Sequence, residues 1–153
     1  MTPAARFAAA IEILDQIQSG APAEKSLTTW ARQNRFAGSK DRAALRDHVY
    51  DVLRAKRSLS ALGGGTQGRA LILGLLRRDG VNPDQVFGAG GYGPEPLTAQ
   101  ERSQGRPPTE GAEACDIPDW LWPQWQASLG DMAKEAAIVQ QSRGPVTLRV
   151  NLR

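Results

Sequence analysis

The first hundred residues alternate between helical patterns of apolar side chains and breaks at glycine or proline. From Pro3 to Gly20 the apolar positions recur every three or four residues, which predicts an embedded helix that Thr2 caps. A shorter helix is predicted to end at Asn34. Residues 70–76 are apolar on nearly every side, so we expect them to form a central buried helix. The pattern therefore predicts an all-α bundle.

The sequence RFAGSKDRAALRDHVYDVLR, residues 35–54, carries the third predicted helix. Ser39 follows a glycine and is a suitable cap for its first turn. Four apolar residues form the side expected to face the core, namely Leu45, Val49, Val52 and Leu53. A rotation of about 100° per residue places a second set beside that stripe. We call this set the basic flank; it consists of Arg46, Tyr50, Arg54 and Arg57.

The pattern changes after residue 102, where the predicted bundle of residues 1–102 ends. Residues 103–116 have no periodicity and predict a mobile linker. The segment 117–153 begins with three tryptophans within six positions, interpreted as anchors for a short helix. Residues 146–153 alternate between apolar and polar positions, which predicts a β-strand. Because a lone strand cannot pair its backbone, we expect it to belong to a second domain, incomplete in this chain.

The charge is distributed unevenly along the 153 residues, although the net charge is only +3. Residues 1–80 contain 13 basic and seven acidic residues, whereas residues 81–153 contain six basic and nine acidic residues. A basic N-terminal half favours an anionic partner, and nucleic acid is the usual candidate. Arginine-rich surface helices without a ligand are the alternative.

Several kinds of chemistry are excluded by what the sequence lacks. Cys115 and His48 are the single cysteine and the single histidine, so we expect no disulfide, no metal site and no nucleophilic catalysis. The segment GGGTQGRA, residues 63–70, lacks the spacing of a phosphate loop and is predicted to connect two helices. We therefore expect no catalytic residue and no cofactor-binding residue in this chain.

The location is predicted from two further absences. No apolar run approaches the roughly 20 residues that span a bilayer. The N-terminus also lacks the features of a signal peptide. The protein is therefore predicted to be cytoplasmic, with no membrane partner.

The basic flank is the strongest functional signal in the sequence. Arginine binds phosphates through two parallel hydrogen bonds and stacks on bases, and tyrosine offers a further stacking surface. Basic residues at the start of the same helix extend the flank. The predicted RNA-binding set is Arg35, Lys40, Arg42, Arg46, Tyr50, Arg54 and Arg57. A solvated helix surface without a ligand is the alternative.

Several segments together resemble the NusB-like domain that begins bacterial Sun/Fmu RNA cytosine-C5 methyltransferases. RFAGSKDRAALRDHVYDVLR resembles the second motif of that domain, PAARFAAAIEILDQI its first helix and RALILGLLRRDG its central helix. GYGPEPLTAQE resembles its proline loop and capping box. IPDWLWPQW resembles the Pro-x-Trp helix that follows, and VTLRVN the first strand of an RRM-like segment. The segments occur in the order found in the family.

The resemblance implies a NusB-like helical bundle that positions ribosomal RNA for a parent enzyme. It also implies S-adenosylmethionine as the cofactor of that enzyme and a C-terminal methyltransferase domain as a further partner. The chain has no counterpart of that catalytic half, so no catalytic residue is carried over. Two alternatives stay open: a standalone NusB-type RNA- and protein-binding module in transcription antitermination, and an interaction domain that binds an acidic protein.

Overall fold

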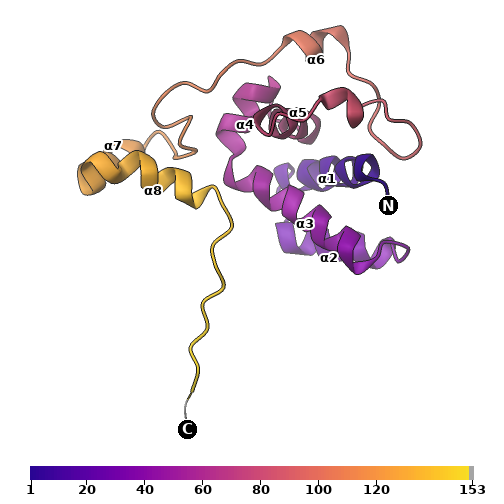
Figure 1. Ribbon diagram of the computed structural model, residues 1–153, viewed down its shortest axis with the longest axis horizontal. Coiled ribbons are helices and arrows are strands. Elements are labelled where there is room, and N and C mark those ends of the chain that lie inside the picture. Colours follow the sequence, from indigo (N-terminus) through magenta and orange to yellow (C-terminus); the bar gives the residue numbers. More distant parts are fainter. Residues whose placement is uncertain (152–153) are drawn as a thin grey trace.

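The computed structural model describes residues 1–151, and this part of the chain is all-α. The elements in chain order are α1 (Pro3–Gln18), α2 (Ala23–Gln33), α3 (Ser39–Arg54), α4 (Lys56–Gly63), α5 (Gly68–Arg78), the 3-10 turn η1 (Pro83–Gln85), α6 (Ala99–Ser103), α7 (Trp122–Leu129), the 3-10 turn η2 (Gly130–Met132) and α8 (Ala133–Gln140). Figure 1 shows α1–α5 gathered in one bundle and α7 with α8 in a separate lobe beside it. Within the described residues, no helix has the length and apolar character needed to cross a membrane.

The first helix begins as predicted, whereas the third begins differently. Thr2 accepts a hydrogen bond from the Ala5 amide, and Pro3 is the first residue of α1. Ser39 is not the cap of α3 but its first residue, and Gly38 is the cap. The Asp41 carboxylate accepts a hydrogen bond from the Gly38 amide at 3.2 Å, so the side chain of the third helical residue binds the backbone of the cap residue.

Asp41 also ties the start of α3 to the start of α1. Its carboxylate accepts hydrogen bonds from the N-terminal ammonium group of Met1 at 3.2 Å and from Arg6 Nε at 2.9 Å. These two cationic groups, with the N-terminal ammonium group first, hold the pKa of Asp41 below its ordinary value. The two helix ends are thereby fixed relative to each other.

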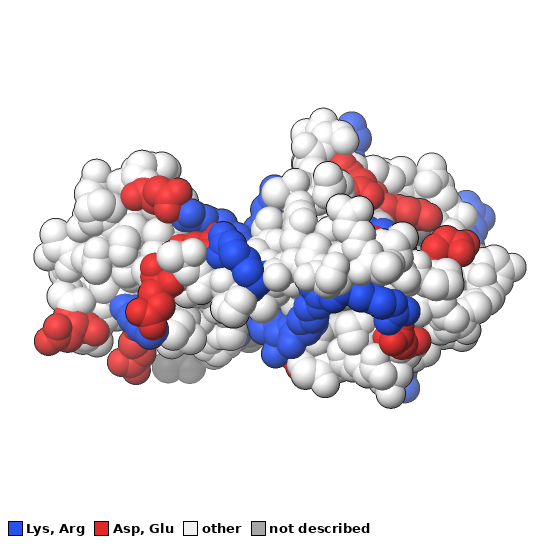
Figure 2. All heavy atoms as spheres, turned by 90° about the horizontal axis from the view of Figure 1, so that it is seen from above, with Lys and Arg blue, Asp and Glu red and all other residues white. Residues whose placement is uncertain are grey.

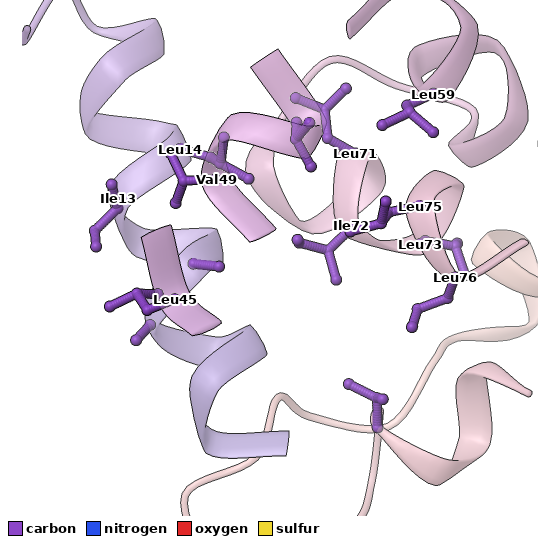
Figure 3. Packing of buried hydrophobic residues seen from close by; sticks show 14 of the residues in the cluster. Ile13, Leu14, Leu45, Val49, Leu59, Leu71, Ile72, Leu73, Leu75 and Leu76 are labelled. Carbon is purple, nitrogen blue, oxygen red and sulfur yellow. The ribbon is translucent and has the colours of Figure 1, made fainter. Parts of the chain in front are cut away.

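The core lies where α1, α3 and α5 meet (Figure 3). Ile13 and Leu14 of α1 point toward Leu45 and Val49 of α3, as the apolar pattern predicts. The predicted stripe of α3 is confirmed at Leu45, Val49 and Val52, which are fully buried, whereas Leu53 is half-buried. Every residue of α5 from position 70 to position 76 is buried, so the prediction of a central helix is also confirmed.

The helices α4 and α5 cross so closely that their backbones touch. A Cβ atom added at Gly74 of α5 would overlap the carbonyl oxygen of Leu59, and one added at Gly63 of α4 would overlap the carbonyl oxygen of Ala70. Gly64 ends α4 in the left-handed region, with φ 77°. The glycine-rich segment is therefore a helix connector, as predicted.

Replacing Gly74 with alanine is expected to lower the free energy of unfolding by about 2 kcal/mol, because the added methyl group forces α4 away from α5. Gly144→Ala is the matched control, since a Cβ at Gly144 meets no atom within 4 Å. Urea unfolding followed by circular dichroism measures both. Equal midpoints for the two variants would show that the crossing tolerates the methyl group.

The third helix ends three residues before Arg57, and this corrects the predicted basic flank. Ala55 has φ −126° and ψ 32°, which interrupts the helix, and α4 starts at the next residue. The carboxylate of Asp116 accepts the amides of Arg57 and Ser58, both at 2.8 Å, and so caps the new helix. Burial raises the pKa of Asp116. Arg57 therefore lies on α4 and does not continue the face of α3.

The segment 103–116 holds more fixed contacts than its lack of periodicity suggests. The Arg106 amide donates to the carbonyl of Ala61 in α4 at 2.9 Å. The Arg106 guanidinium binds the Glu113 carboxylate at 2.7 Å and lowers the pKa of Glu113 to about 2. Cys115, predicted to lie in a flexible setting, is buried, and burial raises the pKa of its thiol. The segment forms a strap from the bundle to the α7–α8 lobe (Figure 1).

The lobe is built around two of the three predicted tryptophan anchors. Trp122 and Trp125 pack with Cys115 and other apolar residues, and Trp125 Nε1 donates to the Ala133 carbonyl at 2.8 Å. Pro123 lies in the first turn of α7, where its missing N–H leaves no helical hydrogen bond unmade. Trp120 is not an anchor, because 71% of its surface is exposed.

The predicted terminal strand is not formed. Residues 143–151 follow α8 without regular structure, and Val146, Leu148 and Val150 are exposed. The described residues 1–151 contain no strand that could pair with this segment, so its backbone has no sheet to join. The last two residues of the predicted strand, Leu152 and Arg153, lie outside the described residues.

Candidate nucleic-acid interface

A groove of about 670 Å³ lies between α2 and α3, and its polar side chains are mainly arginines. We call it the α2–α3 groove. Its arginines come from the last turn of α2, the connecting turn and the first two turns of α3: Arg32, Arg35, Arg42 and Arg46. Among the described residues that line it, none carries a carboxylate. Four positive charges therefore surround one hollow.

Buried residues of both helices fix the floor of this groove. Leu27 and Trp30 of α2 and Leu45 of α3 line it and belong to the core. Ala37, in the turn between the helices, is buried, and its carbonyl accepts Arg42 Nε at 2.9 Å. The turn is thus fixed by the burial of Ala37 and by its hydrogen bond with Arg42. Arg42 therefore both lines the groove and stabilises the turn beside it.

Arg46 lies next to a carboxylate at the edge of the groove. Its guanidinium is 3.8 Å from Glu24, and both side chains are more than half exposed. Exposed pairs of this kind contribute at most about 1 kcal/mol, so Arg46 can exchange Glu24 for a phosphate at little cost. Glu24 also accepts the Tyr50 hydroxyl at 2.7 Å, and this hydrogen bond raises the pKa of Tyr50.

A second hollow, of about 320 Å³, continues from Arg46 along α3. It is lined by Tyr50 and Arg54, two further members of the predicted set, and by Arg143 from the segment after α8. Arg54 pairs with Asp51 at 3.2 Å and lies 5.6 Å from the centre of the Tyr50 ring. Because its arginines share the surface with carboxylates, this hollow attracts anions less strongly than the α2–α3 groove.

The remaining two predicted residues have different positions. Lys40 is exposed on the first turn of α3, next to Ser39, which lines the groove. Arg57 faces the lobe, where it binds the Ile117 carbonyl and donates to Asp119 at 2.6 Å. Arg57 therefore joins the lobe to the bundle, and the structure does not bring it to the groove.

Sequence reasoning missed two arginines, Arg32 and Arg143. Arg32 had a detectable signal, because it lies three positions before Arg35 and beside the same turn. Arg143 reaches α3 from a segment almost 100 residues later in the chain and lies 3.8 Å from Asp47. No local pattern indicates such a position.

Arginines on another face of the molecule are already paired with carboxylates. Figure 2, seen from above the view of Figure 1, shows basic and acidic side chains next to one another. One arginine each of α5, α6 and the strap forms an ion pair at 2.5–2.7 Å: Arg69 with Glu101, Arg102 with Asp84, and Arg106 with Glu113. The α2–α3 groove differs in that none of its lining residues is acidic, and the one carboxylate at its edge, Glu24, is 3.8 Å from Arg46.

The glycine-rich segment does not fit a nucleotide cofactor. Its glycines serve the contact of α4 with α5, and a cofactor loop would need a preceding strand, which residues 1–151 do not contain. Within the same residues, no group of three or more histidine, cysteine or acidic side chains is placed to hold a metal ion. His48 stacks on Phe7 with ring centres 4.2 Å apart, and burial lowers the pKa of His48.

Comparison with known proteins provides no relative from which a role could be transferred. No protein family, curated protein or solved structure matches this chain. The function is therefore inferred from the geometry of the groove and from the sequence motifs.

Proposed function

We propose that this chain binds RNA through the α2–α3 groove and positions it as the substrate of an S-adenosylmethionine-dependent RNA cytosine-C5 methyltransferase. The observation that carries the proposal is the clustering of Arg32, Arg35, Arg42 and Arg46 around one hollow without an acidic lining residue. Guanidinium groups match the geometry of phosphate oxygens and release counterions from the nucleic acid when they bind. Such a groove favours a polyanion over a neutral ligand.

The enzyme class comes from the resemblance to the NusB-like domain of Sun/Fmu methyltransferases. We assign binding and positioning of ribosomal RNA to this chain, and methyl transfer to a separate domain that would hold S-adenosylmethionine. The exposed, alternating apolar side chains of residues 146–150 suit a segment that pairs with a sheet of that domain. We place the protein in the cytoplasm, where ribosomal RNA is available to it.

Fluorescence anisotropy with a labelled ribosomal RNA stem–loop tests the RNA-binding function. Four phosphate contacts predict a dependence of log K on log salt with a slope of about −3, and a dissociation constant in roughly the micromolar range at physiological salt. Poly-glutamate is the competitor that represents an acidic protein. Displacement of the RNA by an equal charge concentration of poly-glutamate would favour an acidic protein partner and contradict the proposal.

A further inference from the structure

A second groove, of about 830 Å³, lies on the other side of the turn that ends α2. We call it the apolar groove. It runs between the start of α1, the turn at residues 34–36 and the loop at residues 85–92. Its floor consists of small side chains of α1, namely Ala4, Ala5, Ala8 and Ala9. The small side chains leave a flat surface that a planar ring can approach closely.

Two strongly exposed aromatic side chains border the apolar groove. Phe36 is 74% exposed and Tyr92 is 90% exposed. Exposing an aromatic ring to water costs free energy, and this free energy is regained when a ligand covers the ring. Both rings are thus available to a ligand that enters the groove.

The backbone holds Phe36 outward. The preceding Asn34 closes α2, with its amide and its side chain both donating to the carbonyl of Trp30 at 2.9 Å. The following Ala37 is buried, and its amide donates to the Asn34 carbonyl at 3.0 Å. The backbone on both sides of Phe36 is thus held by hydrogen bonds, and the ring of Phe36 projects from this turn into solvent.

Tyr92 is presented by a tight glycine turn. Gly90 and Gly91 both have positive φ, at 76° and 61°, and the Gly93 amide donates to the Gly90 carbonyl at 3.1 Å. Residues other than glycine rarely adopt such values of φ, so the sequence is suited to this turn. The ring therefore projects from a defined loop at the rim of the groove.

The apolar groove and the α2–α3 groove adjoin at the end of α2. Trp30 lines both grooves, and Arg35 of one groove is followed in the chain by Phe36 of the other. An arginine-lined channel for phosphates beside aromatic rings for bases is the arrangement that binds single-stranded nucleic acid. A duplex can place its phosphates on the arginines, but its bases are paired and stacked inside the helix and cannot stack on the aromatic rings.

We infer that the RNA bound by this chain is single-stranded, with its phosphates on the arginines of the α2–α3 groove and its bases on Phe36 and Tyr92 in the apolar groove. The inference rests on the proposed function and adds the class of substrate to it. The apolar groove includes Glu12, which repels phosphates, and the amides of Asn34 and Gln85, which can hydrogen-bond to base edges. These residues favour bases over the sugar–phosphate backbone in this groove.

The test compares a labelled single-stranded RNA with a duplex of the same sequence. The unmodified protein is expected to bind the single strand at least ten times more tightly than the duplex. Phe36→Ala with Tyr92→Ala is expected to weaken single-strand binding about 25-fold, because each stacked base contributes about fivefold or more. Duplex binding should change less than twofold. Trp120→Ala is the matched control, since Trp120 is 71% exposed on the lobe, and it should leave both affinities unchanged.

The outcomes separate this inference from the proposed function when Arg35→Glu is measured alongside. If Arg35→Glu weakens RNA binding but the double aromatic variant does not, the inference is wrong and the proposed function stands. The inference is also overturned if the double aromatic variant weakens duplex binding and single-strand binding equally. It is likewise overturned if Trp120→Ala weakens single-strand binding as much as the double aromatic variant does. If Arg35→Glu leaves the binding of both RNAs unchanged, the proposed function itself is wrong.

Discussion

Reversing Arg32, Arg35 and Arg46 together to glutamate is expected to weaken RNA binding at least about a hundredfold at physiological salt. Each lost phosphate contact lowers the affinity for RNA about fourfold, because fewer counterions are released on binding. The new carboxylates also repel the phosphates. The fold should persist, because all three side chains are exposed and Arg42, which braces the turn, is retained. Anisotropy with labelled RNA measures the loss, and circular dichroism monitors the helices.

The control for this triple variant reverses three exposed basic residues outside both hollows, namely Lys56, Lys134 and Arg149. It changes the net charge by the same amount but leaves the groove intact. We expect it to weaken RNA binding less than tenfold. Equal losses for the two triple variants would mean that net charge alone drives binding, which contradicts a specific groove.

The second large effect is expected at Asp116, whose carboxylate joins the strap, α4 and α8. It accepts the amides of Arg57 and Ser58, the Ser58 hydroxyl at 2.7 Å and the Gln141 side-chain amide at 2.9 Å. Asp116→Ala removes all of these hydrogen bonds and the cap of α4. We expect it to lower the free energy of unfolding by about 3 kcal/mol. One hydrogen bond to a charged group contributes about 1.5–3 kcal/mol, and the loss of four such bonds is partly offset because water can reach the freed donors and because the buried carboxylate no longer has to be desolvated.

Asp116→Asn is the matched control for that substitution. Asparagine keeps an oxygen that can accept the amides of α4, and it tolerates the positive φ of 54° found at this position. The loss in free energy of unfolding for Asp116→Asn should be less than half of the loss for Asp116→Ala. Urea unfolding followed by tryptophan fluorescence reports on the lobe through Trp122 and Trp125. If alanine and asparagine give the same midpoint as the unmodified chain, the carboxylate does not hold the lobe.

The bundle was predictable because its helices follow local rules. The apolar spacing of α1, α3 and α5 repeats with the period of a helix, and the core residues Leu45, Val49 and Val52 are where that spacing places them. The capping box of α6 is also visible in the sequence as Thr98 followed three residues later by Glu101, and these two residues form it. These features depend on neighbours within a few residues.

The features that were missed depend on partners far away in the chain. Asp116 stabilises the break at Ala55 by capping α4, and Asp119 binds Arg57. The periodicity of α3 could therefore indicate neither the helix break nor the position of Arg57. The α2–α3 groove exists only because two helices lie side by side, which places Arg32 and Arg42 in one hollow. For the same reason, the alternation of residues 146–150 could not form a strand without a second strand to pair with.

The most direct test of RNA binding by the α2–α3 groove is an amide NMR titration of the isotope-labelled chain with a short single-stranded RNA. The proposal predicts that the largest chemical-shift changes fall on residues 28–46, which span the end of α2, the turn and the start of α3. Smaller changes are expected on the segment after α8, where Arg143 lies. Shift changes confined to residues 99–142, or no changes at RNA concentrations well above the expected dissociation constant, would contradict it.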